Sequence, residues 1–329
     1  MNDPSFDIVI PTLGRPELAA LLRSLDTGPG PLPEHLWVVD DRRDRSRPLP
    51  LPRLSTALEE RLRTRAGFAA GPASARNIGW RASRATWVVF LDDDVIVDPD
   101  WREALARDLA AVSREAAGSQ GVVRVPLPVG RRPTDWERNV ASLETARWIT
   151  ADMAYRRDVL QLVGGFDERF TRAYREDSDL ALRILTWGFL IERGSRRVQH
   201  PVRPADFWIS VRSQRGNGDD VLMDILHGAD WYERAGAPRG LLRSHKRTTA
   251  CALLAAICLL SGRRREAAVV AAVWLARTAV FGWRRIAPGP KTGREVLTMI
   301  ATSTAIPFCS VFHRFIALAR WRLLGARAL

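Results

Sequence analysis

The sequence predicts an α/β fold with a mostly parallel central sheet, followed by an all-α C-terminal region. In the N-terminal part of the chain, short apolar runs alternate with segments whose apolar residues recur at helical spacing, which is typical of parallel βαβ units. In the C-terminal part, longer apolar runs are separated by clusters of arginine. We therefore divide the 329-residue chain into a predicted α/β domain, 1–238, and a basic helical region, 239–329.

The predicted strands and helices of the first domain follow one another in order. Phe6–Ile10 and His35–Val39 are short, mostly apolar runs that predict strands, and Arg15–Leu25 between them has the spacing of a helix. The other predicted strands are 62–64, 87–91, 122–125, 149–155 and a short strand ending at Val198. The other predicted helices are 73–82, 158–163 and a helix that begins near Glu176.

Three consecutive carboxylates, Asp92, Asp93 and Asp94, follow the apolar run 87–91. Such groups repel one another, and a hard divalent cation relieves the repulsion because Mg²⁺ and Mn²⁺ take oxygen ligands. Such a cation can also bridge a carboxylate to a diphosphate. A solvated acidic turn is the alternative interpretation of an isolated triplet.

Other polar residues also follow predicted strands. Thr12 and Asp41 stand at such positions, as the acidic triplet does. Ligands of open α/β sheets bind outside the carboxyl ends of the strands, so we expect these residues to line one crevice. The sequence contains no Gly-x-Gly-x-x-Gly and no Gly-Lys-Ser/Thr loop, and an ordinary dinucleotide or P-loop site is not predicted.

Two further sites have alternative interpretations. Glu176 and Asp177 fall in the first turn of a predicted helix, where acidic residues are favoured by the helix dipole without any catalytic role. His200 precedes a proline and is either a turn residue or a ligand.

Six motifs taken together, in this order, resemble the family 2 glycosyltransferases with the GT-A fold. The matching segments are 9–12 (VIPT), 38–41 (VVDD), 71–79 (GPASARNIG), 90–94 (FLDDD), 164–168 (GGFDE) and 176–177 (ED). The resemblance covers about two thirds of the chain and leaves the basic tail outside it.

The resemblance implies roles for individual residues. Those implied near the nucleotide sugar are Pro11, Thr12, Asp41, Arg76, Asn77, Asp92 and Asp93, with Thr12 and Asp41 at the nucleobase and ribose. Asp94 corresponds to the direct metal ligand of the family's DxD motif, and His200 to an extra ligand in some GT-A enzymes. Asp177 corresponds to the catalytic base, with Glu176 as the alternative if the register is shifted.

The implied reaction is an inverting, metal-dependent transfer of one sugar, with Mg²⁺ or Mn²⁺ as cofactor. The donor is a UDP, GDP or dTDP sugar, and the acceptor is a hydroxyl of a glycan or a lipid-linked molecule of the cell envelope. The chain lacks the Gln-x-x-Arg-Trp motif of processive members, which favours transfer of one sugar.

Two other functions compete with glycosyl transfer. A sugar nucleotidyltransferase has a related sheet but uses a lysine-containing loop after the first strand, and residues 11–16 contain no lysine. A non-catalytic scaffold on the same fold is disfavoured because the acidic triplet and the Glu-Asp pair are both present.

The tail predicts a partner with negative charge. From Arg239 to Leu329 there are 16 Lys and Arg but 2 Asp and Glu, whereas the whole chain has a net charge of +13. Three nearly uncharged runs, 248–262, 267–283 and 296–312, are bordered by basic residues, and each is shorter than the roughly 20 residues that span a bilayer. This pattern favours helices lying on an anionic membrane, and a helical bundle packed on the catalytic domain is the alternative.

The predicted location is the cytoplasmic side of the cell membrane. Met1–Ser5 do not form a basic and apolar leader, and Cys251, Cys258 and Cys309 are spaced neither like zinc ligands nor like a disulfide framework. Nucleic acid is not a predicted partner, because the tail is apolar and contains no nucleic-acid motif.

Overall fold

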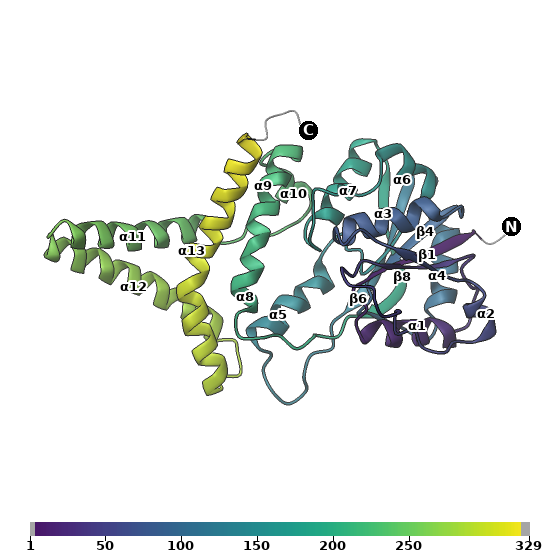
Figure 1. Cartoon of the computed structure of the whole chain (residues 1–329), viewed down its shortest axis with the longest axis horizontal. Helices are drawn as coiled ribbons and strands as arrows, with labels where there is room; N and C mark the ends of the chain where they lie inside the picture. The colour runs from purple at the N-terminus through teal and green to yellow at the C-terminus, as the bar shows by residue number, and fades with distance from the viewer. Residues whose placement is uncertain (1–3, 324–329) are drawn as a thin grey trace. The chain divides into compact units, whose positions relative to one another are not determined.

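The computed structural model describes residues 4–323, which form two compact units (Figure 1). The first comprises the residues up to Pro126 together with Ala141–Val202 and Arg234–Gly236. The second comprises Leu127–Val140, Arg203–Glu233 and the residues from Ala237 onward. These units interleave along the chain, and the single division between residues 238 and 239 stays a prediction. Residues 1–3, part of the segment that predicts no leader, lie outside the described residues.

The first unit is built on a mixed sheet whose strand order is β3-β2-β1-β4-β7-β6-β8-β5. The strands are β1 (Phe6–Thr12), β2 (Leu36–Asp40), β3 (Leu62–Ala66), β4 (Trp87–Leu91), β5 (Ile96–Val97), β6 (Ala116–Arg124), β7 (Asp152–Arg156) and β8 (Leu190–Gln199). β1 pairs in parallel with β2 and β4, and β2 pairs in parallel with β3. β7 is antiparallel to both β4 and β6, while β6 is parallel to β8.

The helices of the first unit cover the sheet. They are α1 (Glu17–Thr27), α2 (Thr56–Glu59), α3 (Pro72–Ala82), α4 (Trp101–Ala111), α6 (Arg157–Val163) and α7 (Glu176–Thr186), with a 3₁₀ turn at Ser142–Thr145. All five residues of β4 are buried, and α1 buries the apolar stripe that its spacing predicts, from Leu18 to Leu25. The prediction of an α/β domain with a mostly parallel sheet flanked by helices is confirmed.

The second unit is helical. Its elements are α5 (Asp135–Ala141), α8 (Ile209–Arg212), a 3₁₀ turn (Ser213–Arg215), α9 (Gly216–His227), α10 (Trp231–Arg234), α11 (Leu242–Leu260), α12 (Arg264–Ile286) and α13 (Gly293–Leu323). The second and third apolar runs of the tail lie inside α12 and α13, and most of the first run lies in α11, which ends at Leu260. The helices are longer than the runs because arginine continues a helix readily. By length and composition, α12 and α13 are each sufficient to cross a membrane.

Candidate active site

The sheet brings the predicted site residues to one edge. β1, β2 and β4 are parallel, so Thr12, Asp41 and the acidic triplet all follow strand ends on the same side. β8 has the same direction as β4, because β7 reverses between β4 and β6 and β6 is parallel to β8. His200, the residue after β8, therefore reaches this edge as well.

Asp92, Asp94 and His200 form a group in which one donor atom of each residue lies within 4.8 Å of the others. The short antiparallel pairing of Ile96 with Gln199 brings the residues before β5 next to the residue after β8. His200 Nε2 lies 3.5 Å from Asp94 Oδ1, and His200 Nδ1 is buried without a hydrogen-bond partner among the described residues. Two carboxylates and one imidazole fit a divalent cation such as Mn²⁺.

Asp93 is directed to the turn after β1. Its Oδ2 accepts a 2.6 Å hydrogen bond from Thr12 Oγ1, and its Oδ1 accepts a 3.1 Å bond from Arg15 Nη1. Thr12 Oγ1 in turn accepts the backbone N–H of Gly14. These bonds fix the loop between β1 and α1. Arg15 was not expected at the site, because the helical spacing of 15–25 places it at a helix start.

Asp41 presents a carboxylate beside this turn. Its Oδ2 accepts the backbone N–H of Gly71 at 2.8 Å, and its own N–H donates to Thr12 O. Its Oδ1 is buried, with no hydrogen-bond partner among the described residues. A Cβ at Gly67 would lie 2.5 Å from that oxygen, so glycine is required there. Pro11, half-buried in β1, pairs with Val39 beside this group.

Arg76 connects the acidic triplet to α7. Its Nη2 donates to Asp92 Oδ1 at 2.7 Å, and its Nη1 donates to Glu176 Oε1 at 2.8 Å. The Arg76 and Glu176 side chains are 1% and 2% exposed. Arg76 also lies over the ring of Phe166. Two carboxylates and an aromatic ring face thus hold the guanidinium of Arg76 in one orientation.

Glu176 and Asp177 form the first turn of α7, and the residue before them, Arg175, has a φ of 77°. Asp177 Oδ1 accepts the N–H of Ser178 at 2.6 Å. Burial raises the pKa of Glu176, the charge of Asp177 raises it further, and Arg76 opposes both effects. Burial also raises the pKa of Asp177. A carboxyl whose pKa is raised accepts a proton more readily, which suits a general base.

Asn77 is directed away from the acids. Its side chain is buried, its Oδ1 accepts Phe166 N and Trp80 Nε1, and its Nδ2 donates to Phe166 O and to Glu168. The amide is therefore used to hold the turn that contains Phe166. The predicted contact of Asn77 with the donor stays a prediction.

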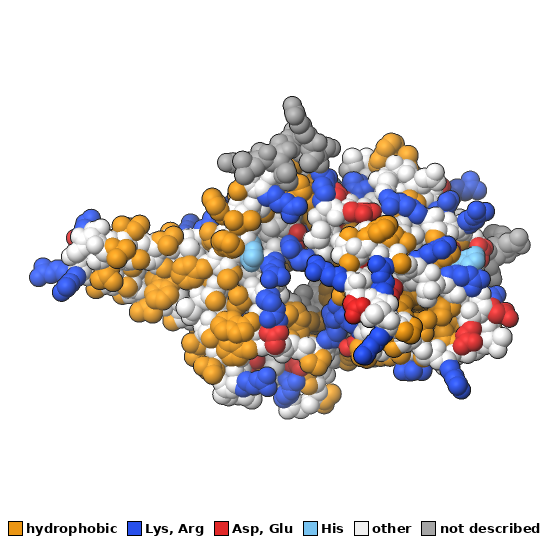
Figure 2. All heavy atoms as spheres, in the orientation of Figure 1, with side chains coloured by type: hydrophobic (Ala, Val, Ile, Leu, Met, Phe, Trp, Pro, Cys, Tyr) orange, Lys and Arg blue, Asp and Glu red, His pale blue; other side chains and the backbone are white. Residues whose placement is uncertain are grey.

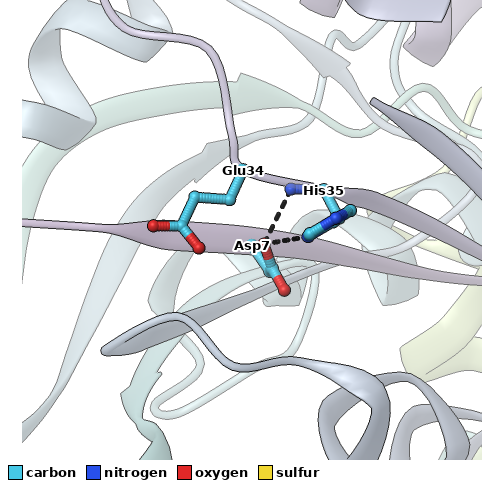
Figure 3. A group of neighbouring side chains, drawn as sticks. All are labelled: Asp7, Glu34 and His35. Carbon is cyan, nitrogen blue, oxygen red and sulfur yellow. Dashed lines mark hydrogen bonds and ion pairs between the residues drawn. The ribbon is translucent and has the colours of Figure 1, made fainter. Parts of the chain in front are cut away.

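A second group of potential ligands, Asp7, Glu34 and His35, lies near the start of β1 and β2 (Figure 3). Asp7 is fully buried, and its Oδ1 accepts the N–H of His35 at 2.7 Å. Its Oδ2 accepts Trp37 Nε1 at 3.0 Å. Both oxygens are thus engaged in holding the start of β2, and we interpret this group as structural.

The fold and the site define an α/β protein with carboxylates and a histidine grouped at the carboxyl ends of parallel strands, the edge at which open α/β sheets bind their ligands. The model of the family described as "Glycosyl transferase family 2" matches residues 7–179. The chain therefore belongs to the family 2 glycosyltransferases, as its motifs predict. This membership favours glycosyl transfer over nucleotidyl transfer.

Two known proteins illustrate the similarity. The chain is 27% identical over 178 residues to the O-antigen biosynthesis protein RfbC of Myxococcus xanthus, a match that covers 41% of this chain and 13% of that protein. Among solved structures, a mannosyltransferase from Pyrobaculum calidifontis in complex with GDP-Man and Mn²⁺ is similar with a TM-score of 0.54 and 17% identity. That likeness covers 97% of this chain and 88% of the other, and it supports the fold.

Proposed function

We propose that the protein is an inverting, metal-dependent glycosyltransferase that moves one sugar from a nucleotide-sugar donor to a hydroxyl group. One observation carries this proposal: Arg76 bridges Asp92, in the group that fits a cation, to Glu176, which is adjacent to Asp177. Through this one side chain, the candidate cation site, where the leaving diphosphate would lie, is connected to the candidate proton acceptor.

The residues that would hold the cation are Asp92, Asp94 and His200. The cation, when bound, neutralises the charge that develops on the leaving nucleoside diphosphate. The placement of Asp93 on Thr12 and Arg15 supports Asp92 and Asp94 as the acidic ligands. The mixed oxygen and nitrogen donors favour Mn²⁺ over Mg²⁺, because imidazole is a poor ligand for Mg²⁺.

Asp177 is the proposed general base. In the reaction, the acceptor oxygen forms a bond to the anomeric carbon while the bond from that carbon to the diphosphate oxygen breaks. The proton of the acceptor hydroxyl passes to Asp177 Oδ, and no covalent intermediate on the protein is needed. Glu176 remains the alternative base, but its ion pair with buried Arg76 makes it less available for a proton.

Thr12, Asp41 and Pro11 are proposed to contact the nucleotide. The unpartnered Oδ1 of Asp41 is an acceptor for an N–H of the base, and uracil, thymine and guanine each carry a ring N–H. UDP, dTDP and GDP sugars all satisfy this requirement. The similar mannosyltransferase is in complex with GDP-Man.

The proposed acceptor is a cell-envelope glycan or a lipid-linked precursor, reached from the cytoplasmic face of the membrane. The name of the Myxococcus relative supports a cell-envelope glycan. The exposed apolar side chains of α11, α12 and α13, together with the basic charge of this region, support association with an anionic membrane.

Nucleotide-binding calorimetry tests the proposal. We expect one of UDP, GDP, dTDP and CDP to bind with Mn²⁺ and to lose most of its affinity without the metal or in Asp94→Ala. Asp177→Asn should keep that binding and lose transfer, and the product formed by the native protein should have the inverted anomeric configuration by NMR. Absence of metal-dependent binding for all four nucleotides would refute the donor site.

A further inference from the structure

Helices α11 and α12 pack along each other and are joined by a short turn at residues 261–263, so that they form a helical hairpin (Figure 1). Between residues 249 and 260, and again between 267 and 283, every exposed residue is apolar. The exposed residues in these two segments are Ala250, Leu253, Leu254, Ala256, Ile257, Leu259, Leu260, Ala268, Val269, Ala272, Val273, Leu275, Ala276, Ala279, Val280 and Trp283. In Figure 2 the visible face of this hairpin is largely hydrophobic.

The one charged side chain within these segments is directed inward. Arg277, on α12, donates to Thr248 Oγ1 and to Ser244 O of α11, at 3.1 Å each. Its guanidinium therefore donates hydrogen bonds to the partner helix. The hairpin surface along the segments 249–260 and 267–283 has no charged face.

This distribution distinguishes two ways of meeting a membrane. A helix that lies in the interface has one polar face for water and one apolar face for lipid. A hairpin that is apolar on all sides gains most when its whole circumference is in an apolar medium. The α11–α12 hairpin has the second kind of surface wherever α13 does not pack against it.

The length of the hairpin and its charges point to the same arrangement. Arg263, Arg264 and Arg265 stand at the tip, and the helix rises about 20 Å from Arg263 to Arg277 at about 1.5 Å per residue. This length exceeds the thickness of one leaflet, since a leaflet is about half of the roughly 30 Å hydrocarbon core. Extended arginine side chains reach further toward phosphate groups.

A second copy of the chain is a poorer partner for this surface. The region 239–329 carries 16 basic and 2 acidic residues, so two hairpins packed together would bring arginines close to arginines. An anionic bilayer offers acyl chains for the apolar sides and phosphates for the tip.

We infer that the α11–α12 hairpin enters the lipid bilayer tip first, with its apolar sides among the acyl chains. Arg263, Arg264 and Arg265 then reach the phosphate groups of the far leaflet. This inference rests on the membrane association in the proposed function and replaces helices that lie on the surface with a hairpin that penetrates it.

Depth-dependent fluorescence quenching tests the inference on the full chain. Cys251, Cys258 and Cys309 are replaced by alanine, and a single cysteine carrying an environment-sensitive dye is placed by Leu260→Cys, Val273→Cys or Val280→Cys. The vesicles contain phosphatidylglycerol and phosphatidylethanolamine, with nitroxides either at the headgroup or deep in the acyl chain. We expect the deep nitroxide to quench the dye at 273 more than at 260 and 280, because 273 lies between the tip and the base.

Two results would overturn the inference. Equal, shallow quenching at all three positions would place the hairpin flat in the interface. Absence of quenching at all three would exclude lipid around it, and calorimetric nucleotide binding by the same preparation would show whether the donor site is intact.

A charge substitution gives an independent measurement. Val273→Asp is expected to weaken partitioning into the vesicles on the order of 100-fold, because an aspartate is strongly disfavoured in the bilayer interior. Leu190→Asp, at a comparably exposed apolar position in β8, should leave partitioning unchanged (52% exposed, against 46% for Val273). Equal partitioning of both variants and the native chain, with native melting temperatures, would contradict the inference.

Discussion

Arg76 donates a 2.8 Å hydrogen bond to Glu176 although both side chains are almost completely buried. A buried ion pair contributes little net stability, because desolvation offsets most of the attraction between the charges. Its effect here is positional. The planar guanidinium fixes Glu176, at the start of α7, relative to Asp92, at the end of β4. The distance between the candidate cation site and the candidate base is thereby set by one residue.

Substitution of Arg76 should therefore lower both the stability of the protein and its transfer activity. Arg76→Ala leaves Glu176 buried without its partner, and we expect a loss of about 3–5 kcal/mol of unfolding free energy together with transfer activity. Arg76→Lys should recover part of the stability, because the lysine ammonium can bond to one carboxylate but cannot bond to Asp92 and Glu176 together as the guanidinium does. Urea denaturation measures the stability. The control is Arg81→Ala on the same helix, whose ion pair with Glu168 is exposed and should be worth at most about 1 kcal/mol. Equal losses for the two alanine variants would contradict a special role for Arg76.

The Glu176 and Asp177 pair predicts opposite effects of pH on activity and stability. Burial raises the pKa of both carboxyls above their ordinary values. A base must be deprotonated, so activity should fall as pH is lowered through the raised pKa values. The folded state holds these protons more tightly than the unfolded chain, so the pair's contribution to stability is present at low pH and is lost as pH rises through the raised pKa values. Rate profiles and melting temperatures over the same pH range check both statements.

Glu176→Gln distinguishes the role of Glu176 from that of Asp177. It removes one negative charge beside Asp177, and the acidic limb of the rate profile should therefore move to lower pH. An acidic limb that stays in place would indicate that Asp177 titrates independently of its neighbour. Loss of the limb altogether would make Glu176 the base.

The two groups of potential ligands should differ in metal binding. Asp94→Asn is expected to weaken Mn²⁺ binding by at least about 100-fold and His200→Ala by about 10-fold, since loss of even an outer partner costs about 10–100-fold. Titration of Mn²⁺ followed by electron paramagnetic resonance gives the affinities. Asp7→Asn is the control, because Asp7 already accepts hydrogen bonds from His35 and Trp37, and it should lower stability without changing Mn²⁺ affinity. A loss of Mn²⁺ binding in Asp7→Asn would move the metal site to the start of β1.

The sequence predicted the parts of the site that depend on strand ends. Buried apolar runs identify β1, β2 and β4, and parallel pairing then brings Thr12, Asp41 and the acidic triplet together. The resemblance implied Asp94 as the direct metal ligand, but it did not separate Asp92, which lies in the group with Asp94 and His200, from Asp93, which does not. That depends on side-chain direction, with Asp93 directed to Thr12 and Asp92 to Arg76. The position of His200 depends on the two-residue pairing of β5 with β8, which is too short to leave a periodic pattern.

Two further features could not be predicted from the sequence. Asn77 belongs to a family motif, but its amide is engaged by backbone groups of Phe166, nearly ninety residues away in sequence, and no local pattern reveals this. In the tail, counting uncharged residues underestimated the helices, because α12 includes Arg264 and Arg265 at its start and Arg284 and Arg285 at its end. Charged residues end an uncharged run but do not end a helix.

The turn held by Asn77 offers a matched pair of glycine substitutions. Gly164 and Gly165 follow α6 with φ values of 82° and 76°, a conformation that costs an alanine about 1 kcal/mol in either position. An added Cβ at Gly164 meets no atom within 4 Å, whereas at Gly165 it would lie 2.5 Å from Trp80 Nε1 and 2.6 Å from Asn77 Oδ1.

Gly165→Ala should therefore destabilise the protein by about 1–3 kcal/mol more than Gly164→Ala, because crowding in a packed interior adds to the backbone cost. Chemical denaturation of both variants measures the difference. The displaced Asn77 would also release Phe166, whose ring lies against Arg76, so nucleotide binding should weaken in Gly165→Ala alone. Equal denaturation midpoints would mean that the turn yields without cost, and Asn77 would then be free to serve the donor directly.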